Sequence, residues 1–422
     1  MKKKIDILNS VLFTTVTIAG GIIFWVMPQQ TVSTDENREL KKQPVATMES
    51  VFSGKYGKDF EEFYNDHFPW RNDWMEVASQ IDTVKGIKNQ EFRVINTPTE
   101  QATPTAPTAQ AAEKVDINKA IAEEEALEAE FSKVRGVIVV NGRVVQNFAG
   151  SKATISPFVD MLNTYRNTLP ATVTMYAMMI PAGSDYYLPK QVNNGVKKEK
   201  ESIDLFNTLI DPRIIPVPAY EETWPHKNEY IMFRTDHHWT GLGAYYAYRA
   251  FATSAGMTPL ELSQMQHVTT EGTFLGSLFN YTKDQELKKN PDTLDYYKIP
   301  GDYTVTIYPK SNPKGIPGQL LVENSKSYGV FLGGDWPLTH IKNNQPQNNK
   351  KLLVVKDSFG NALSTYLGYH YSDVYVIDYR HFKGNIPQFI AENGITDFLY
   401  AHNTFAANSK AVVKYGTQML KN

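Results

Sequence analysis

The feature of this sequence that most restricts its fold is the alternation of short apolar runs with helix-forming segments after residue 131. Runs at residues 173–180, 351–355 and 374–378 are typical of strands, and the segments between them space their apolar residues as a helix does. Such alternation is typical of a parallel sheet that helices cover on both faces. We therefore predict an α/β sandwich of three layers, with a mostly parallel sheet, over residues 131–422.

Two local signals mark the start of this domain. Asn141-Gly142 lies between the apolar segments 136–140 and 143–148 and has the signature of a type I′ hairpin turn. Ser156 followed by Pro157 predicts a helix capped by Ser156, because proline is favoured at the first helical position.

The first thirty residues predict the compartment. Lys2, Lys3 and Lys4 precede a mostly apolar segment without Lys, Arg or Glu, residues 7–27. A membrane-spanning helix needs about 20 such residues, and flanking lysines favour the cytoplasmic side. We predict that residues 1–30 are a signal-anchor that crosses the cell membrane once and leaves the bulk of the chain extracytoplasmic. A cleaved signal peptide and a buried core helix are the alternatives.

Composition changes between this segment and the α/β domain. Residues 31–95 predict a partly helical extracytoplasmic extension. Residues 96–130 combine a Thr/Pro/Ala/Gln tract with an acidic, Ala/Glu-rich helix. Because the tract cannot pack a core, we interpret residues 96–130 as a linker that ends where the α/β domain begins, at residue 131.

Charge and cysteine content exclude several classes of function. The 43 Lys and Arg residues nearly balance the 45 Asp and Glu residues, so the chain lacks the basic excess that nucleic-acid binding requires. The sequence contains no cysteine, which excludes disulfides, thiol nucleophiles and cysteine-ligated zinc. We expect no cofactor.

Ser358 is the candidate nucleophile. It follows Asp357 directly after the buried strand 351–355, and a helix begins there. Ligands of such sheets bind beyond the carboxyl ends of the strands, and a helix N-terminus stabilises a developing oxyanion. The alternative interpretation is that Asp357 or Ser358 only caps the helix.

Asp236 and His238 are the candidate acid and base. They are two residues apart, so in an extended segment both side chains project from one face and His237 points elsewhere. A carboxylate at that position can hold the imidazole tautomer that a general base needs. A buried, satisfied histidine pair and a metal site are the alternatives, although the spacing lacks the i,i+4 histidine pair of helical zinc sites.

Several further polar residues are candidates for contacts with the substrate or with an oxyanion. Chain order does not disqualify Asp236, His238 and Ser358 as a triad, because triads are defined by geometry. The further candidates are Asn361, Asp357, Asp335 after the twin glycines, Tyr186, Arg380, Asn403 and Trp239.

Four segments together resemble the DHHW family of Gram-positive extracytoplasmic proteins. They are TDHHWT at residues 235–240, FLGGDWP at 331–337, KDSFGN at 356–361 and VYVIDYRHF at 374–382. ENREL, FYNDHFPWR and GTFLGSLF extend the resemblance over most of the chain.

This family is similar to the SGNH-hydrolase-like proteins that O-acetylate alginate and other exopolysaccharides, which implies an SGNH-hydrolase-like sandwich. Their Asp-x-His-Trp segment corresponds to Asp236, His238 and Trp239, and their Gly-Asp-Ser segment ends on Asp357 and Ser358. Lys356 occupies the position of their glycine, which is a departure from the pattern. The resemblance also implies a membrane-bound O-acyltransferase as the partner that supplies the acyl group, and a polysaccharide acceptor.

Three functions follow as hypotheses. The first is a serine-dependent acyl transferase or esterase that uses Ser358, His238 and Asp236 on a cell-surface or secreted polysaccharide. The second is a non-catalytic scaffold that binds polysaccharide or cell wall with the same fold. The third is a metal-dependent hydrolase that uses Asp236, His237 and His238.

Overall fold

The computed structural model describes residues 14–15, 20–27, 32–33, 38–71, 73–74, 77, 81, 92–95, 136–310 and 314–421. The chain divides into two compact units. The smaller contains Met1–Lys88 with Phe279–Gln285, and the larger contains Asn89–Leu278 with Glu286–Asn422.

The smaller unit is partly helical. Residues 20–26 form a helix whose Phe24 is buried against Phe63 and Tyr64, with ring centroids 5.7 and 4.9 Å away. The predicted membrane-spanning segment, residues 7–27, falls largely outside the described residues. In the described part of the chain, no helix combines the length and apolar character needed to span a bilayer. The elements of this unit are β1 (Val32–Ser33), β2 (Arg38–Glu39), α2 (Met48–Phe52) and α3 (Lys55–Asp66).

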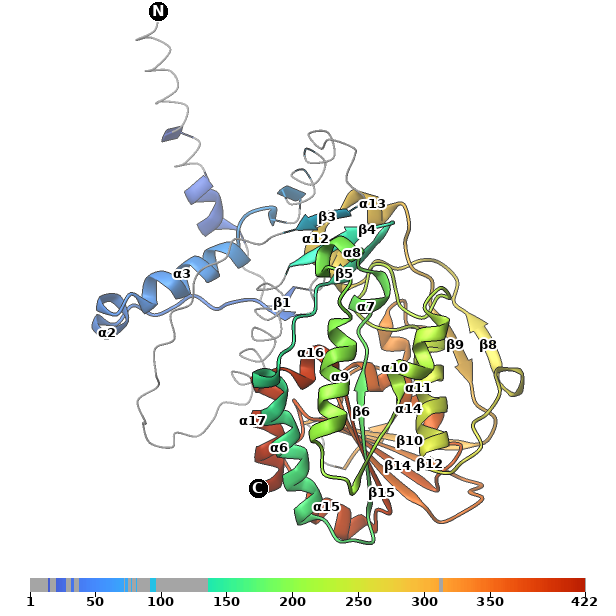
Figure 1. The fold of residues 1–422 in the computed structure, drawn as a ribbon. Coiled ribbons are helices and arrows are strands. Elements are labelled where there is room, and N and C mark those ends of the chain that lie inside the picture. Colours follow the sequence, from blue (N-terminus) through green and yellow to red (C-terminus); the bar gives the residue numbers. More distant parts are fainter. Residues whose placement is uncertain are drawn as a thin grey trace, which may run out of the picture. The chain divides into compact units, whose positions relative to one another are not determined.

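An eight-stranded sheet forms the centre of the larger unit (Figure 1). Five adjacent strands are parallel, whereas the three at the other edge are antiparallel. The sheet is therefore mixed. The strands are, in order across the sheet, β7 (Ile214–Pro216), β6 (Thr174–Ile180), β15 (Asp397–Asn403), β13 (Lys351–Lys356), β14 (Asp373–Asp378), β12 (Leu338–Asn343), β10 (Tyr303–Tyr308) and β11 (Ile316–Pro317). The predicted parallel arrangement holds for five of its strands, β7, β6, β15, β13 and β14.

Successive residues of the central strands face two separate hydrophobic cores, one on each side of the sheet. In β13, Leu352 and Val354 belong to one core, and Leu353 and Val355 belong to the other. Helices cover both faces, so the unit has the three layers that were predicted (Figure 1). One face carries α11 (Gly241–Ser254) and α14 (Phe359–Leu367), and the other carries α6 (Lys152–Thr168), α9 (Lys198–Leu209), α15 (Ile386–Asn393) and α17 (Lys410–Lys421).

The hairpin prediction is confirmed, whereas the predicted start of α6 is wrong. Asn141 and Gly142 have φ values of 49° and 69°, as a type I′ turn requires. Helix α6 is capped by Ser151, five residues before the predicted cap Ser156, because Ser151 and Thr154 form a capping box. Pro157 consequently lies inside the helix, where one backbone hydrogen bond is missing.

A three-stranded antiparallel sheet joins residues from both sides of the predicted linker. Its strands are β3 (Phe92–Ile95), β4 (Val137–Val140) and β5 (Arg143–Gln146), and Ile95 pairs with Val137. The linker and acidic helix predicted over residues 96–130 lie outside the described residues. The shorter elements are α7 (Ser184–Tyr187), α8 (Lys190–Asn193), α10 (Ala219–Thr223), β8 (Gln266–Thr269), α12 (Ser277–Thr282), α13 (Gln285–Lys288), β9 (Asp295–Lys298) and α16 (Thr404–Ala407).

The parallel strands end at one edge of the sheet, and this edge carries the candidate site. Ser358 follows β13, Arg380 follows β14 and Asn403 ends β15. Since β13 pairs with both β14 and β15, these residues come from neighbouring strand ends.

Candidate active site

Ser358 stands between the end of β13 and the first residue of α14. It occupies the N-cap position, but its side chain makes no capping hydrogen bond. Asp357 Oδ1 instead accepts the Phe359 N–H at 3.0 Å. The Ser358 hydroxyl is therefore left to another partner.

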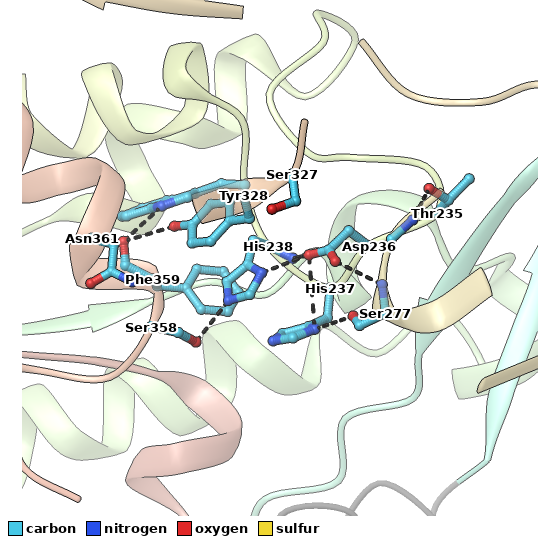
Figure 2. A network of polar contacts seen from close by, with 12 residues as sticks. Thr235, Asp236, His237, His238, Ser277, Ser327, Tyr328, Ser358, Phe359 and Asn361 are labelled. Atoms are coloured by element: carbon cyan, nitrogen blue, oxygen red, sulfur yellow. Dashed lines mark hydrogen bonds and ion pairs between the residues drawn. The ribbon is translucent and has the colours of Figure 1, made fainter. Parts of the chain in front are cut away.

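That partner is His238, whose Nε2 lies 2.7 Å from Ser358 Oγ across 120 positions of sequence (Figure 2). On the other side of the imidazole, Asp236 Oδ1 lies 2.6 Å from Nδ1 and also accepts the His238 backbone N–H at 3.0 Å. A carboxylate at Nδ1 keeps the proton there, so Nε2 accepts from the serine hydroxyl. The structure brings the three predicted residues into one hydrogen-bonded series.

The backbone that carries Asp236 differs from the expected extended segment. Residues 234–238 form bends, closed by a bridge between Met232 and Trp239 and by the Phe233 N–H donating to the His238 carbonyl at 3.1 Å. The alternation of side chains in a strand does not apply to such a loop. The contact between Asp236 and His238 arises from this tight loop.

Asp236 is held as a carboxylate despite its burial. Burial favours its neutral form, but the adjacent His238 and His237 and the Ser277 N–H outweigh it and keep the Asp236 pKa well below its usual range. A permanent negative charge at this position stabilises an imidazolium at His238.

Gly276 and Ser277 form a cradle for Asp236 that the sequence did not reveal as functional. The Ser277 N–H donates to Asp236 Oδ2 at 2.8 Å. A Cβ at Gly276 would overlap the Asp236 side chain, so the close approach requires glycine. Both residues belong to the GTFLGSLF segment, which had contributed only to the family resemblance.

His237 does not point away from the site, contrary to expectation. Its ring centroid lies 3.8 Å from that of His238, and its Nδ1 lies 2.6 Å from Ser277 Oγ. Figure 2 shows its other nitrogen directed towards the side on which Ser358 lies. Burial and the neighbouring His238 lower the His237 pKa to about 3, so the ring is neutral at physiological pH.

Two aromatic residues fix His238 and the start of α14. The Tyr328 ring lies parallel to the imidazole at 3.8 Å, and its hydroxyl donates to the Phe359 carbonyl at 3.3 Å. Trp239 is buried and donates its indole N–H to the same carbonyl at 3.0 Å. Trp239 thus holds the histidine segment against α14, and no sequence signal pointed to Tyr328.

Asp236, His237 and His238 also satisfy the geometric condition for a metal site, since one donor atom of each lies within 4.8 Å of the others. However, both nitrogens of His238 already have partners, Asp236 and Ser358. A metal ion bound by His238 would have to displace one of these hydrogen bonds. The donor set therefore fits the hydrogen-bonded series better than a metal centre.

Three residues predicted to contact substrate belong instead to a buried ionic cluster with Lys356. The Lys356 ammonium lies 2.8 Å from Asp335 and 2.7 Å from Asp378. Arg380 contacts the same two carboxylates at 2.7 and 2.9 Å, and Asn361 donates to Asp335 at 2.7 Å. The lysine that departs from the glycine of the related proteins is thus neutralised within the fold.

The ion pairs dominate the ionisation of this cluster. Burial disfavours charge on Asp335, but Lys356 and Arg380 outweigh it and hold the Asp335 pKa well below its usual range. The same balance, with Arg380 the larger contributor, lowers the pKa of Asp378 to about 2. Burial likewise opposes the charge on Lys356, yet the two carboxylates raise its pKa.

The remaining candidates have structural partners. Asp357 Oδ2 accepts from both the backbone and the side-chain amide of Asn403, at 2.7 and 2.9 Å, which ties β13 to β15. The Tyr186 hydroxyl lies 2.6 Å from Thr223 Oγ1, and its neighbour Tyr187 lines the pocket beside Asp236 instead.

The helix N–H groups expected to face an oxyanion are already engaged. The Phe359 N–H donates to the Asp357 carboxylate, and those of Gly360 and Asn361 donate to the Asp357 and Ser358 carbonyls. These three N–H groups, which were predicted to stabilise an oxyanion, therefore donate to Asp357 and Ser358 within the same turn.

Fold and site together define a mixed α/β sandwich with a serine, a histidine and a carboxylate hydrogen-bonded in series at its sheet edge. The chain belongs to the DHHW family: residues 114–377 match the family model described as DHHW protein. The crystal structure of a DHHW family protein from Eubacterium siraeum is 32% identical, with a TM-score of 0.61, over 68% of this chain and 96% of that chain.

Bacillus cereus PatB1 has the same fold. Its structure is 19% identical with a TM-score of 0.56, over 65% of this chain and 98% of that chain. A second PatB1 structure, with a sulfonyl adduct, is 18% identical with a TM-score of 0.54, over 66% of this chain and 99% of that chain. A search of curated proteins finds no match.

Proposed function

We propose that the chain is a serine-dependent acyl transferase or esterase that acts on an extracytoplasmic polysaccharide. The observation that carries the proposal is the series from Asp236 through His238 to Ser358, with separations of 2.6 and 2.7 Å. These distances are already those of a nucleophile and its general base, so no rearrangement is needed to activate the serine.

The reaction proceeds in two steps. Ser358 Oγ attacks the acyl carbonyl while His238 Nε2 takes the hydroxyl proton, and the leaving group departs with that proton, which leaves an acyl-serine. A sugar hydroxyl or water then gives its proton to His238 and attacks the acyl-serine, which transfers the acyl group and restores Ser358. Asp236 stabilises the imidazolium in both steps.

Further support comes from the resemblance of this sequence to a family of known enzymes. The resemblance to SGNH-hydrolase-like proteins that O-acetylate exopolysaccharides favours acetyl as the acyl group. We propose that the apolar residues 7–27 anchor the chain to the cell membrane, with a membrane-bound O-acyltransferase as the donor partner. Tethering beside such a partner would raise its effective concentration.

The test uses the full chain with 4-nitrophenyl acetate and an activated sulfonyl fluoride probe. We expect Ser358→Ala to lose both probe labelling and at least about 1,000-fold of its turnover. Ser364→Ala is the matched control, because this serine lies in the same helix and its buried hydroxyl has no hydrogen-bond partner among the described residues. Unchanged turnover in a folded Ser358→Ala protein contradicts the mechanism, and an unlabelled wild type favours the non-catalytic scaffold.

A further inference from the structure

A pocket adjoins the hydrogen-bonded series on the side of the β4–β5 hairpin. Its cavity volume is about 10 Å³, room for about one water-sized group, so a ligand enters it with one small group while the rest of the ligand stays outside. Its lining includes Asp236, His237 and His238 together with Arg143 and Tyr187.

Arg143 is a cation of this pocket that forms no ion pair with a carboxylate of the described residues. Its guanidinium carbon lies 3.7 Å above the centre of the Tyr187 ring. Among the described residues, none of the ion pairs involves Arg143. Stacking on an aromatic face leaves the N–H groups at the edge of the guanidinium, where they match the two oxygens of a carboxylate or phosphate.

The hairpin fixes Arg143 relative to Asp236. Arg143 is the first residue of β5 and pairs with Val140 across the type I′ turn. The next residue, Val144, donates its N–H to the Arg234 carbonyl at 2.9 Å, two positions before Asp236. A rigid connection therefore joins the cation to the loop that carries the acid and the base.

The other charged groups of the pocket are already satisfied. Asp236 is paired with His238 and with the Ser277 N–H. His237 bonds Ser277, and its ring is neutral because burial lowers its pKa to about 3. Asp236 keeps its negative charge within these hydrogen bonds, and Arg143 supplies the positive charge of the pocket lining.

We propose that this pocket binds the anionic group, a carboxylate or a phosphate, of the sugar residue that accepts the acyl group, with Arg143 as its ligand. The inference rests on the proposed function for the role of the ligand as acceptor. The chemistry of the pocket alone assigns an acidic rather than a neutral glycan. A charge-assisted pair of this kind contributes about 1.5–3 kcal/mol, which corresponds to roughly 10- to 100-fold in affinity.

Binding to the full chain tests the proposal with ligand pairs that differ in charge. Trigalacturonic acid is compared with its fully methyl-esterified form, and glucose 6-phosphate with glucose, by calorimetric titration of the Ser358→Ala protein. We expect at least one acidic ligand to bind about tenfold or more tightly than its neutral partner. The pair that shows the preference identifies carboxylate or phosphate as the anion.

Arg143→Gln should abolish that preference, and Arg213→Gln should retain it, because Arg213 is exposed and already paired with Asp211. Equal affinity within both ligand pairs, or an unchanged preference in Arg143→Gln, overturns the proposal. Since binding is measured without turnover, a preference that persists when the wild type proves inactive leaves the anion site standing and rejects only the acyl-transfer function.

Discussion

Lys356→Met removes one cation from the buried cluster while it retains a side chain of similar length. The Lys356 side chain is 2% exposed and lies 2.7 Å from Asp378, whose side chain is 0% exposed. Loss of one partner from a buried ion pair costs roughly 3–5 kcal/mol of unfolding free energy. Arg380 remains 2.7 Å from Asp335 and 2.9 Å from Asp378, so we expect the lower end, about 3 kcal/mol at pH 8.

The expected loss depends on pH. The pKa values of Asp335 and Asp378 lie below their usual range in the folded protein, so both carboxyls stabilise the fold above about pH 4, and this stabilisation fades as the pH falls. Without Lys356 the cluster carries an excess negative charge, and the pKa of one carboxyl rises. Protonation then relieves the excess, so the variant should lose less stability at pH 5 than at pH 8.

Urea unfolding of the full chain, followed by tryptophan fluorescence and circular dichroism at both pH values, measures this difference. Lys342→Met is the control, because it makes the same substitution at an exposed position of β12. An unfolding free energy at pH 8 within about 1 kcal/mol of the wild type would refute the reasoning, since it lies below the range for a broken buried pair.

Three further predictions concern other buried positions. Gly276→Ala should reduce turnover about 100-fold or more without loss of secondary structure by circular dichroism, because the new Cβ displaces Asp236. His402→Phe should raise the unfolding free energy by about 1–3 kcal/mol in urea titration, because neither ring nitrogen has a partner among the described residues. Burial lowers the His402 pKa to about 3, so the wild type should lose stability as the pH falls below 6.5, and this variant should lose less. Burial and Asp185 raise the Glu199 pKa to about 7, so stability should fall as the pH rises from 4.5 to 7, and Glu199→Gln should show a smaller decline in melting temperature.

The parallel half of the sheet could be predicted because its strands are buried on both faces and therefore form continuous apolar runs. Strands β6, β13 and β14 are of this kind. The antiparallel edge has a weaker signal. In β10, apolar residues alternate with threonine and tyrosine, and β11 contains only two residues. A strand half exposed in this way resembles a polar loop in sequence.

The members of the hydrogen-bonded series could be found from sequence because each stands in a local pattern, next to a strand end or a helix cap. The residues that support them could not. Ser277 and Tyr328 contact Asp236 and His238 from segments distant in the sequence, and no spacing predicts those contacts. The position of His237 depends on backbone bends, whereas the sequence argument assumed a strand.

The pairing of β3 with β4 has a consequence for engineering the protein. Because Ile95 lies opposite Val137, the chain that leaves the sheet at one residue returns to it beside its point of departure. Lengthening a connection whose ends are already paired costs only about 0.6 kcal/mol for each doubling of its length. Residues 96–136 are therefore the place where a fluorescent reporter or an affinity tag can be inserted while the geometry around Ser358 is preserved.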